Sequence, residues 1–165
     1  MYVIRNREKS KVEEVGKLKY LNQYPYNMKS NVLVPEICIS DFDKSIQFYT
    51  EILGFKIEYQ REEEGFAFLS LGKAQIMIDQ IDKGRTWKTG DFAYPLGRGI
   101  NFQIEVDKIQ PLLYGLKKSN VKLFLEPEEK WYRKENLQVG NKQFLVQDPD
   151  GYLLRFFEDL GTKPL

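Results

Sequence analysis

The side chains that could do chemistry in this sequence are carboxylates, arginines, aromatic rings and a single thiol. The chain contains no histidine and one cysteine, Cys38. Imidazole is therefore absent as a base, a nucleophile partner or a metal ligand, so catalysis or metal binding would rest on Asp, Glu, Lys, Tyr or Cys38. One cysteine also excludes a disulfide within the chain and is compatible with a reducing cytosol.

Arg155 is the most informative of these groups. It interrupts an apolar strand predicted at 152–158, and a charge in a mostly buried strand usually faces a cleft or has a partner. An ion pair with Glu36 or Glu105 explains Arg155 as well as contact with a ligand does. The preceding run Asp-Pro-Asp-Gly (148–151) predicts a tight hairpin turn, because proline presets φ and glycine permits a left-handed residue.

Two copies of one unit are predicted to position these residues. From residue 31, alternating apolar residues predict a strand; Asp41 or Ser40 can cap the following helix, and Gly54 can close it. The apolar face of this helix consists of Phe42, Ile46, Tyr49 and Leu53, and three strands are expected at Lys56–Arg61, Phe66–Leu71 and Gln75–Gln80.

The second copy begins after a linker. Residues 100–106 alternate as a strand, and Asp107 is expected to cap a helix bearing Ile109, Leu112, Leu113 and Leu116. Strands are then expected at Lys122–Leu125, Gln143–Gln147 and Tyr152–Glu158. The repeat predicts an α+β fold of two βαβββ modules, with U-shaped mixed sheets around a concave cleft and helices on the outer face.

The domain boundaries follow from the same pattern. Residues 1–29 are expected to be an N-terminal extension, either a short helix or a disordered tail. Residues 30–80 form the first module, 81–98 the linker, 99–160 the second module and 161–165 a tail.

Strand alternation assigns side chains to the cleft. The apolar positions of each strand must cover the helix of their own module, so the polar positions face the other way. This predicts a cleft lined by Glu36, Phe68, Asp79, Asn101, Gln103, Glu105 and Arg155. Mixed polar and aromatic lining is typical of a ligand pocket, although a solvated sheet surface or a dimer interface would show the same pattern.

The composition of the chain limits the kinds of partner that it can bind. Lys and Arg number 25 and Asp and Glu 24, a near balance that argues against nucleic acid as a main partner, which usually needs a basic face. No apolar run approaches the length of a bilayer span and no signal peptide is evident, so no membrane partner and a cytoplasmic location are expected.

Several motifs together resemble one superfamily. They are Asp41-Phe-Asp-Lys-Ser-Ile-Gln-Phe-Tyr49, Leu53-Gly-Phe55, the paired modules, and Phe144-Leu-Val-Gln-Asp-Pro-Asp-Gly-Tyr-Leu-Leu-Arg-Phe156. The chain resembles the vicinal-oxygen-chelate superfamily of glyoxalase I, extradiol dioxygenases and bleomycin resistance proteins, over about residues 31 to 160. The segment 95–107 and Trp131-Tyr132-Arg133 look most like the bleomycin-resistance branch.

The resemblance also implies where a metal would bind. Enzymes of this superfamily hold a divalent metal through His and Glu, one ligand from each of four strands. The matching positions here are Val34, Met77, Asn101 and Arg155. Only the Asn101 amide is a weak ligand for a hard cation, and Arg155 would repel one. The metal-dependent chemistry is therefore not carried over, and no cofactor is expected.

The function that the resemblance implies is binding without chemistry. We expect a small-molecule ligand, such as a bleomycin-like cationic drug, in the cleft of a homodimer, with antibiotic resistance as the outcome. Trp131 and Tyr132 could stack on heteroaromatic rings, although simple packing explains Trp131 equally well. The alternatives are a metal-dependent lyase, isomerase or dioxygenase-like enzyme that uses Glu36, Asp79 and Glu105, and a module with an unrelated native ligand.

Overall fold

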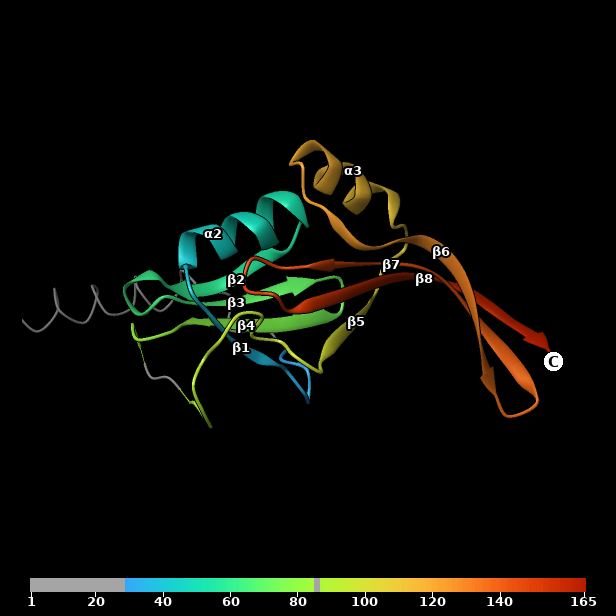
Figure 1. The fold of residues 1–165 in the computed structure, drawn as a ribbon, viewed down its shortest axis with the longest axis horizontal. Coiled ribbons are helices and arrows are strands. Elements are labelled where there is room, and N and C mark those ends of the chain that lie inside the picture. The colour runs from blue at the N-terminus through green and yellow to red at the C-terminus, as the bar shows by residue number, and fades with distance from the viewer. Residues whose placement is uncertain (1–28, 85–86) are drawn as a thin grey trace, which may run out of the picture. The chain divides into compact units, whose positions relative to one another are not determined.

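The structure, a computed structural model, describes residues 29–84 and 87–165. Residues Asn31–Leu165 form one compact unit, which contains both modules (Figure 1). The short helix expected within the N-terminal extension lies outside the described residues. None of the described helices is long and apolar enough to cross a membrane.

The first module has the predicted βαβββ order. Its elements are β1 (Glu36–Ile39), α2 (Phe42–Gln47), the π-helical turn η1 (Phe48–Ile52), β2 (Lys56–Arg61), the 3-10 turn η2 (Glu62–Glu64), β3 (Phe66–Leu71) and β4 (Ala74–Gln80). The sheet order is β1-β4-β3-β2, with β1 parallel to β4 and the other pairs antiparallel. Asp41 caps α2 as predicted, because its carboxylate accepts the Lys44 N–H at 3.0 Å.

The second module repeats this topology. Its elements are β5 (Asn101–Glu105), α3 (Gln110–Lys118), β6 (Leu123–Lys134), β7 (Leu137–Gln147) and β8 (Leu153–Pro164). The order β5-β8-β7-β6, with β5 parallel to β8, matches the first sheet strand for strand. The prediction of an α+β fold built from two βαβββ modules is confirmed.

The last three strands are longer than predicted. β6 and β8 have 12 residues each and β7 has 11. The sequence expectation ended the first of them at Leu125, because the charged run that follows has no apolar alternation. That run nevertheless pairs with β7 as far as Lys134, and β8 continues through 161–164, which were expected to be a tail. In Figure 1 these strands extend well past α3.

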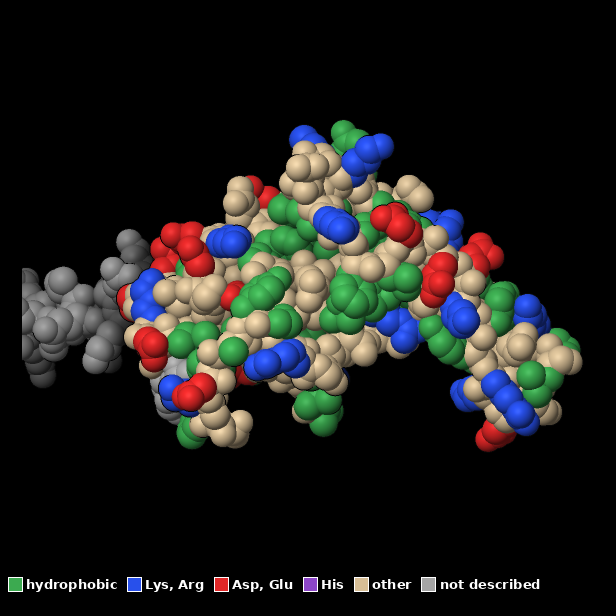
Figure 2. Space-filling model, viewed as in Figure 1, with side chains coloured by type: hydrophobic (Ala, Val, Ile, Leu, Met, Phe, Trp, Pro, Cys, Tyr) green, Lys and Arg blue, Asp and Glu red, His purple; other side chains and the backbone are tan. Residues whose placement is uncertain are grey.

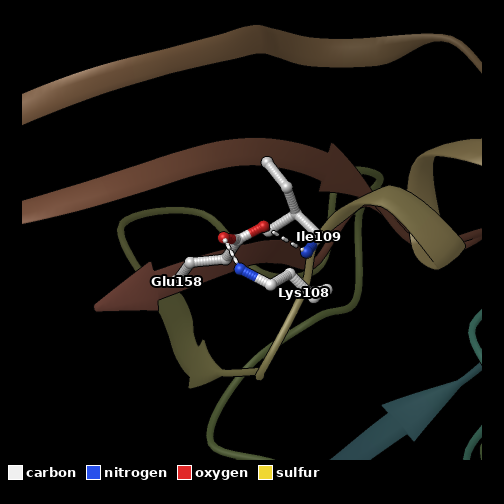
Figure 3. Close-up of polar contacts among 3 residues, drawn as sticks. All are labelled: Lys108, Ile109 and Glu158. Carbon is white, nitrogen blue, oxygen red and sulfur yellow. Dashed lines mark hydrogen bonds and ion pairs between the residues drawn. The ribbon is translucent and has the colours of Figure 1, made fainter. Parts of the chain in front are cut away.

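The start of α3 corrects the expectation for Asp107. The helix begins at Gln110 after an N-cap at Ile109, and no side chain of the cap residue bonds to the helix. Asp107 lies too early to reach the free N–H groups of the first turn. The carboxylate of Glu158 on β8 instead accepts the Ile109 N–H at 2.8 Å and lies 3.2 Å from Lys108 Nζ (Figure 3). A residue from the far end of the module therefore caps this helix.

The apolar core lies between the helices and the sheets and is continuous across both modules. Its fully buried members include Ile39, Tyr49, Leu53, Leu69, Ile78, Ile109, Leu116, Phe144, Leu154 and Phe156. The helices also touch directly, because a side chain at Gly115 of α3 would run into the Ile52 carbonyl oxygen. This packing confirms the predicted strand parity, since the apolar positions of β1, β4 and β8 are buried on the helix side.

Candidate ligand-binding face

Strand register defines the face of each sheet that lies opposite its helix, here called the helix-free face. In the second sheet, Gln103, Arg155 and Leu145 are aligned across β5, β8 and β7. The neighbouring row on the same face is Glu105, Phe157, Gln143 and Glu128. Three predicted residues, Gln103, Glu105 and Arg155, are therefore brought together on one surface.

A hydrogen-bond network fixes Arg155 on this face. The Oε1 atom of Gln143 accepts bonds from Arg155 Nε at 2.9 Å and Nη2 at 2.6 Å. Gln143 Nε2 donates to Glu128 Oε1 at 2.8 Å and lies 2.8 Å from the Tyr132 hydroxyl oxygen. The guanidinium carbon also lies 5.1 Å from the centre of the Tyr132 ring, a cation–π contact. Arg155 thus hydrogen-bonds an amide and not, as one sequence interpretation had it, Glu36 or Glu105.

Two members of this network, Gln143 and Glu128, were missed by the sequence reasoning. Gln143 is only 3% exposed. Its place on the same face as Arg155 could have been found from strand alternation in β7. Glu128 could not have been found in this way, because the strand that carries it was predicted to end at Leu125. Tyr132, a predicted site residue, is 38% exposed and belongs to the network.

Trp131 does not share this face. It pairs with Gly140, next to the Tyr132–Val139 pair, so the two aromatic residues point to opposite sides of the sheet. A side chain at Gly140 would lie 2.7 Å from the indole ring, and Lys163 Nζ lies 3.9 Å from the ring centre. These contacts fit the interpretation of Trp131 as a packing residue, and the predicted stacking on a ligand would have to take place on the face opposite Arg155.

The helix-free face of the first sheet is aromatic. Glu36, Met77, Phe68 and Tyr59 are aligned across its four strands. Tyr59 stacks on Phe68 with ring centres 5.4 Å apart, and Phe68 is only 3% exposed. Phe68 is therefore on the predicted face but is covered by its neighbours.

The predicted carboxylates lie on helix-free faces but form no metal cluster. Glu36 is exposed on β1, Asp79 is half-buried on β4, and Glu105 is exposed on β5. Within residues 29–84 and 87–165, no group of three or more Cys, Asp or Glu side chains is close enough to hold a metal ion. Cys38, which lies opposite Asp79, keeps its thiol protonated: burial raises its pKa first, and the charges of Asp79 and Glu36 raise it further.

The four positions implied for the superfamily metal do not fit one. Met77, Asn101 and Arg155 lie in β4, β5 and β8, and Val34 lies just before β1. This donor set is a thioether, an amide, a guanidinium and a hydrocarbon. A guanidinium has five N–H donors and no acceptor, and a valine side chain has no donor atom for a metal. These four side chains therefore do not form a metal site of the kind that the superfamily's enzymes use.

The Asp-Pro-Asp-Gly turn has a structural role at the joint between modules. The turn closes as predicted, with the Gly151 N–H bonded to the Asp148 carbonyl at 3.1 Å. Asp148 Oδ2 accepts the Tyr49 hydroxyl at 2.8 Å, and Asp150 Oδ1 accepts the Ser40 N–H at 3.0 Å. Burial raises the pKa of Asp148 to about 6, against the lowering effect of the Tyr49 bond. Both aspartates thus tie the second module to the first.

Two surface hollows lie away from the helix-free faces. One of about 510 Å³ lies between α3 and β6, and its lining consists of Leu113, Leu116, Lys117, Asn120, Val121, Lys122, Leu123, Glu126 and Pro127. The other, of about 480 Å³, lies along the outer surface of α2. Neither contains a predicted site residue. On the surface shown in Figure 2, acidic and basic side chains are interspersed and do not form a single basic patch.

Known proteins match both the sequence and the fold. A bleomycin resistance protein of Geobacillus stearothermophilus is 27% identical over 142 residues, which cover 78% of this chain and 97% of the relative. A probable lactoylglutathione lyase of Synechocystis is 28% identical over 133 residues, covering 77% and 94%. The crystal structure of TioX from Micromonospora shares the fold, with a TM-score of 0.62 at 17% identity over 79% of this chain and all of that one.

A family model places the chain more firmly than any single relative. The model of the glyoxalase/bleomycin resistance protein/dioxygenase superfamily matches residues 31–156, which include every element from β1 to β7 and the beginning of β8. The chain belongs to the glyoxalase/bleomycin resistance protein/dioxygenase superfamily.

Proposed function

We propose that this protein binds a small molecule without changing it chemically. The preferred ligand is a bleomycin-like drug with cationic groups, and binding lowers the concentration of free drug in the cytoplasm. The observation that carries the proposal is the state of Arg155. Gln143 holds the guanidinium of Arg155. By the sequence resemblance, Arg155 occupies the position where the superfamily's enzymes have a metal-binding glutamate.

The carboxylates support a cationic ligand. Glu36, Asp79 and Glu105 lie on the helix-free faces, and their charges would attract cationic groups and raise the rate of association. The Tyr132 ring, which lies against Arg155 on the helix-free face of the second sheet, is partly exposed and offers a flat surface to a heteroaromatic ring. The match to bleomycin resistance proteins, which covers nearly the whole length of those relatives, supports the same ligand class.

A homodimer belongs to the same proposal. Among the residues that the structure describes, the outer strands are β1 and β2 in the first sheet and β5 and β6 in the second, and their outer edges pair with no further strand. Open edges and one-sided faces are surfaces that a two-fold partner can cover. We expect a dimer by light scattering at tens of micromolar protein, and a monomer at that concentration would count against this part of the proposal.

Titration calorimetry with bleomycin tests the binding function. We expect saturable binding with a micromolar or lower Kd in protein treated with EDTA. Neutralising one carboxylate with Glu105→Gln should weaken binding several-fold, and more strongly at low salt. Glu126→Gln, which removes an exposed carboxylate at the hollow beside α3, is the matched control and should leave the affinity unchanged. No heat of binding at micromolar protein would reject bleomycin as the ligand.

A second candidate is a metal-dependent lyase, favoured by the match to probable lactoylglutathione lyases. It would need metal held by Glu36, Asp79 and Glu105, since the superfamily's own positions lack suitable donors, and these carboxylates form no metal cluster in the described structure, so they would have to move together. Stoichiometric binding of Mn²⁺, Ni²⁺ or Zn²⁺ that is lost in Asp79→Asn would favour this enzyme over the binding protein.

A further inference from the structure

We propose that Arg155 forms a binding subsite for an anionic oxygen group of the ligand, a carboxylate or a phosphate. This inference rests on the proposed function, because the group would belong to the ligand bound on the same face. It extends that function by adding an anion to a ligand otherwise expected to be cationic, so that the preferred ligand is zwitterionic.

The hydrogen bonds of Arg155 leave one edge of the guanidinium open. Nε and Nη2 both donate to the same acceptor, Gln143 Oε1, so the side edge of the fork is used. Of five N–H donors, both hydrogens on Nη1 and one on Nη2 have no acceptor among the described residues. One hydrogen on Nη1 and the remaining hydrogen on Nη2 form the end edge of the fork, which matches two oxygens of a carboxylate or phosphate.

The network holds this edge in a fixed orientation. Gln143 is 3% exposed, and its amide nitrogen is bonded to Glu128 and Tyr132, so its oxygen must point at Arg155. The Tyr132 ring lies against the guanidinium, which limits rotation about the last bonds of the arginine. Preorganisation of this kind lowers the entropy lost when an anion binds.

The charge of Arg155 has no direct counter-ion in the described residues. The ion pairs found there are Arg61–Glu64 and Lys108–Glu158, neither of which includes Arg155. Glu128 acts on it only through the amide of Gln143. Glu105 lies in the adjacent row of the same face and is the internal carboxylate that could compete with a ligand. A half-buried cation held by a neutral amide favours an anion from outside.

NMR of the full-length protein with labelled arginine tests the subsite. Inorganic phosphate and succinate are titrated separately at constant ionic strength, and the Arg155 Nε–Hε signal is followed. We expect a saturable shift with a millimolar Kd for at least one of them, and the stronger binder identifies phosphate or carboxylate as the preferred source. A linear, non-saturating shift with both anions would overturn the proposal.

Substitutions assign the binding to the guanidinium. In Arg155→Gln, the backbone amides of Gln103 and Leu145, which flank the site, should report affinity about tenfold weaker or worse. Arg155→Lys keeps the positive charge but lacks the forked N–H donors, so its affinity for the anion should lie between those of the wild type and Arg155→Gln. Arg133→Gln changes the same charge on the opposite face of β6 and should have no effect. Equal binding in Arg155→Gln and the wild type would refute the subsite.

Bleomycin separates this inference from the proposed function. If anions bind saturably at Arg155 but bleomycin does not bind, the subsite is supported and bleomycin is rejected as the ligand. If bleomycin binds but neither anion gives a saturable shift, bleomycin is supported as the ligand and the anion subsite is rejected.

Discussion

The two modules share a topology but differ in what covers their helix-free faces. In the first, Tyr59 stacks on the buried Phe68, and Arg61 lies 3.9 Å from the ring centre of Phe66. In the second, Gln143 joins Arg155, Tyr132 and Glu128 by polar contacts. The first face is closed by packed rings, and the second presents charged and polar groups. The shared topology therefore fixes the strand order of each module but not the side chains on its helix-free face.

The modules differ in the same way at their helix starts. Asp41 caps α2 from the adjacent residue, whereas Glu158 caps α3 from 49 residues away. The Asp41 cap is local and can be predicted from the sequence, whereas the Glu158 cap forms only when β8 and α3 come together in the folded module. Substitutions at matching places in the two modules should therefore differ in their effect on stability.

Phe68→Ala should have the largest effect, because it opens a cavity beneath Tyr59. We expect the free energy of unfolding to fall by about 3–4 kcal/mol, as is typical for a buried phenylalanine. Tyr132→Ala, on the corresponding face of the second module, removes a partly exposed ring and should cost less than half as much. Urea denaturation of both variants measures the difference, and equal losses would contradict the distinction between a packed and an open face.

Asp148 should make stability depend on pH. Its pKa of about 6 in the folded chain exceeds its ordinary value of 3.8, so the folded state binds more protons between these values. The contribution of this group to stability is therefore greatest at low pH and falls by about 2–3 kcal/mol as pH rises from 4 to above 6. Asp148→Asn cannot titrate, so its unfolding free energy relative to wild type should rise over this range.

Denaturation curves at several pH values, with the exposed Asp43→Asn as a control, test this expectation. If the difference in unfolding free energy between the wild type and Asp148→Asn stays constant from pH 4 to 7, the Asp148 carboxyl does not titrate in that range.

The two helix caps should differ in strength. Glu158→Ala leaves the buried Ile109 N–H without an acceptor and should destabilise by about 1–3 kcal/mol. Asp41→Ala removes an exposed cap and should cost about 1 kcal/mol. The hydrogen bond from the Ile109 N–H, and after it the contact with Lys108, lowers the pKa of Glu158. The difference in unfolding free energy between the two variants should therefore become smaller at low pH, where the Glu158 carboxylate is protonated. A larger loss of stability in Asp41→Ala than in Glu158→Ala would contradict this expectation.

Gly115 marks the contact between the two helices. Alanine there would gain about 1 kcal/mol of helix propensity, but its methyl group would press on the Ile52 backbone oxygen. Since a backbone atom must move, we expect a net loss of about 1 kcal/mol. Gly90→Ala, which meets no neighbouring atom, is the control and should be near neutral. A stabilised Gly115→Ala would mean that the modules do not press together at this point.

Local pattern predicted most of the fold, because alternation and turn residues act between near neighbours. It placed both helices, the Asp148–Gly151 turn and the face that carries Arg155. It failed for the charged half of β6, whose strand conformation comes from pairing with β7 and not from its own residues. It also failed for the partners of Arg155 and for the Glu158 cap, because these contacts join residues distant in the chain.

The most direct test of ligand binding on the helix-free faces is an NMR titration of the metal-free, uniformly labelled protein with bleomycin. We expect binding on these faces to give saturable shifts of the amides of Glu36, Gln103 and Arg155 in the presence of EDTA, with little change along the outer surface of α2. Shifts that appear only after Zn²⁺ is added, or that map to α2 and the hollow beside α3, would contradict it.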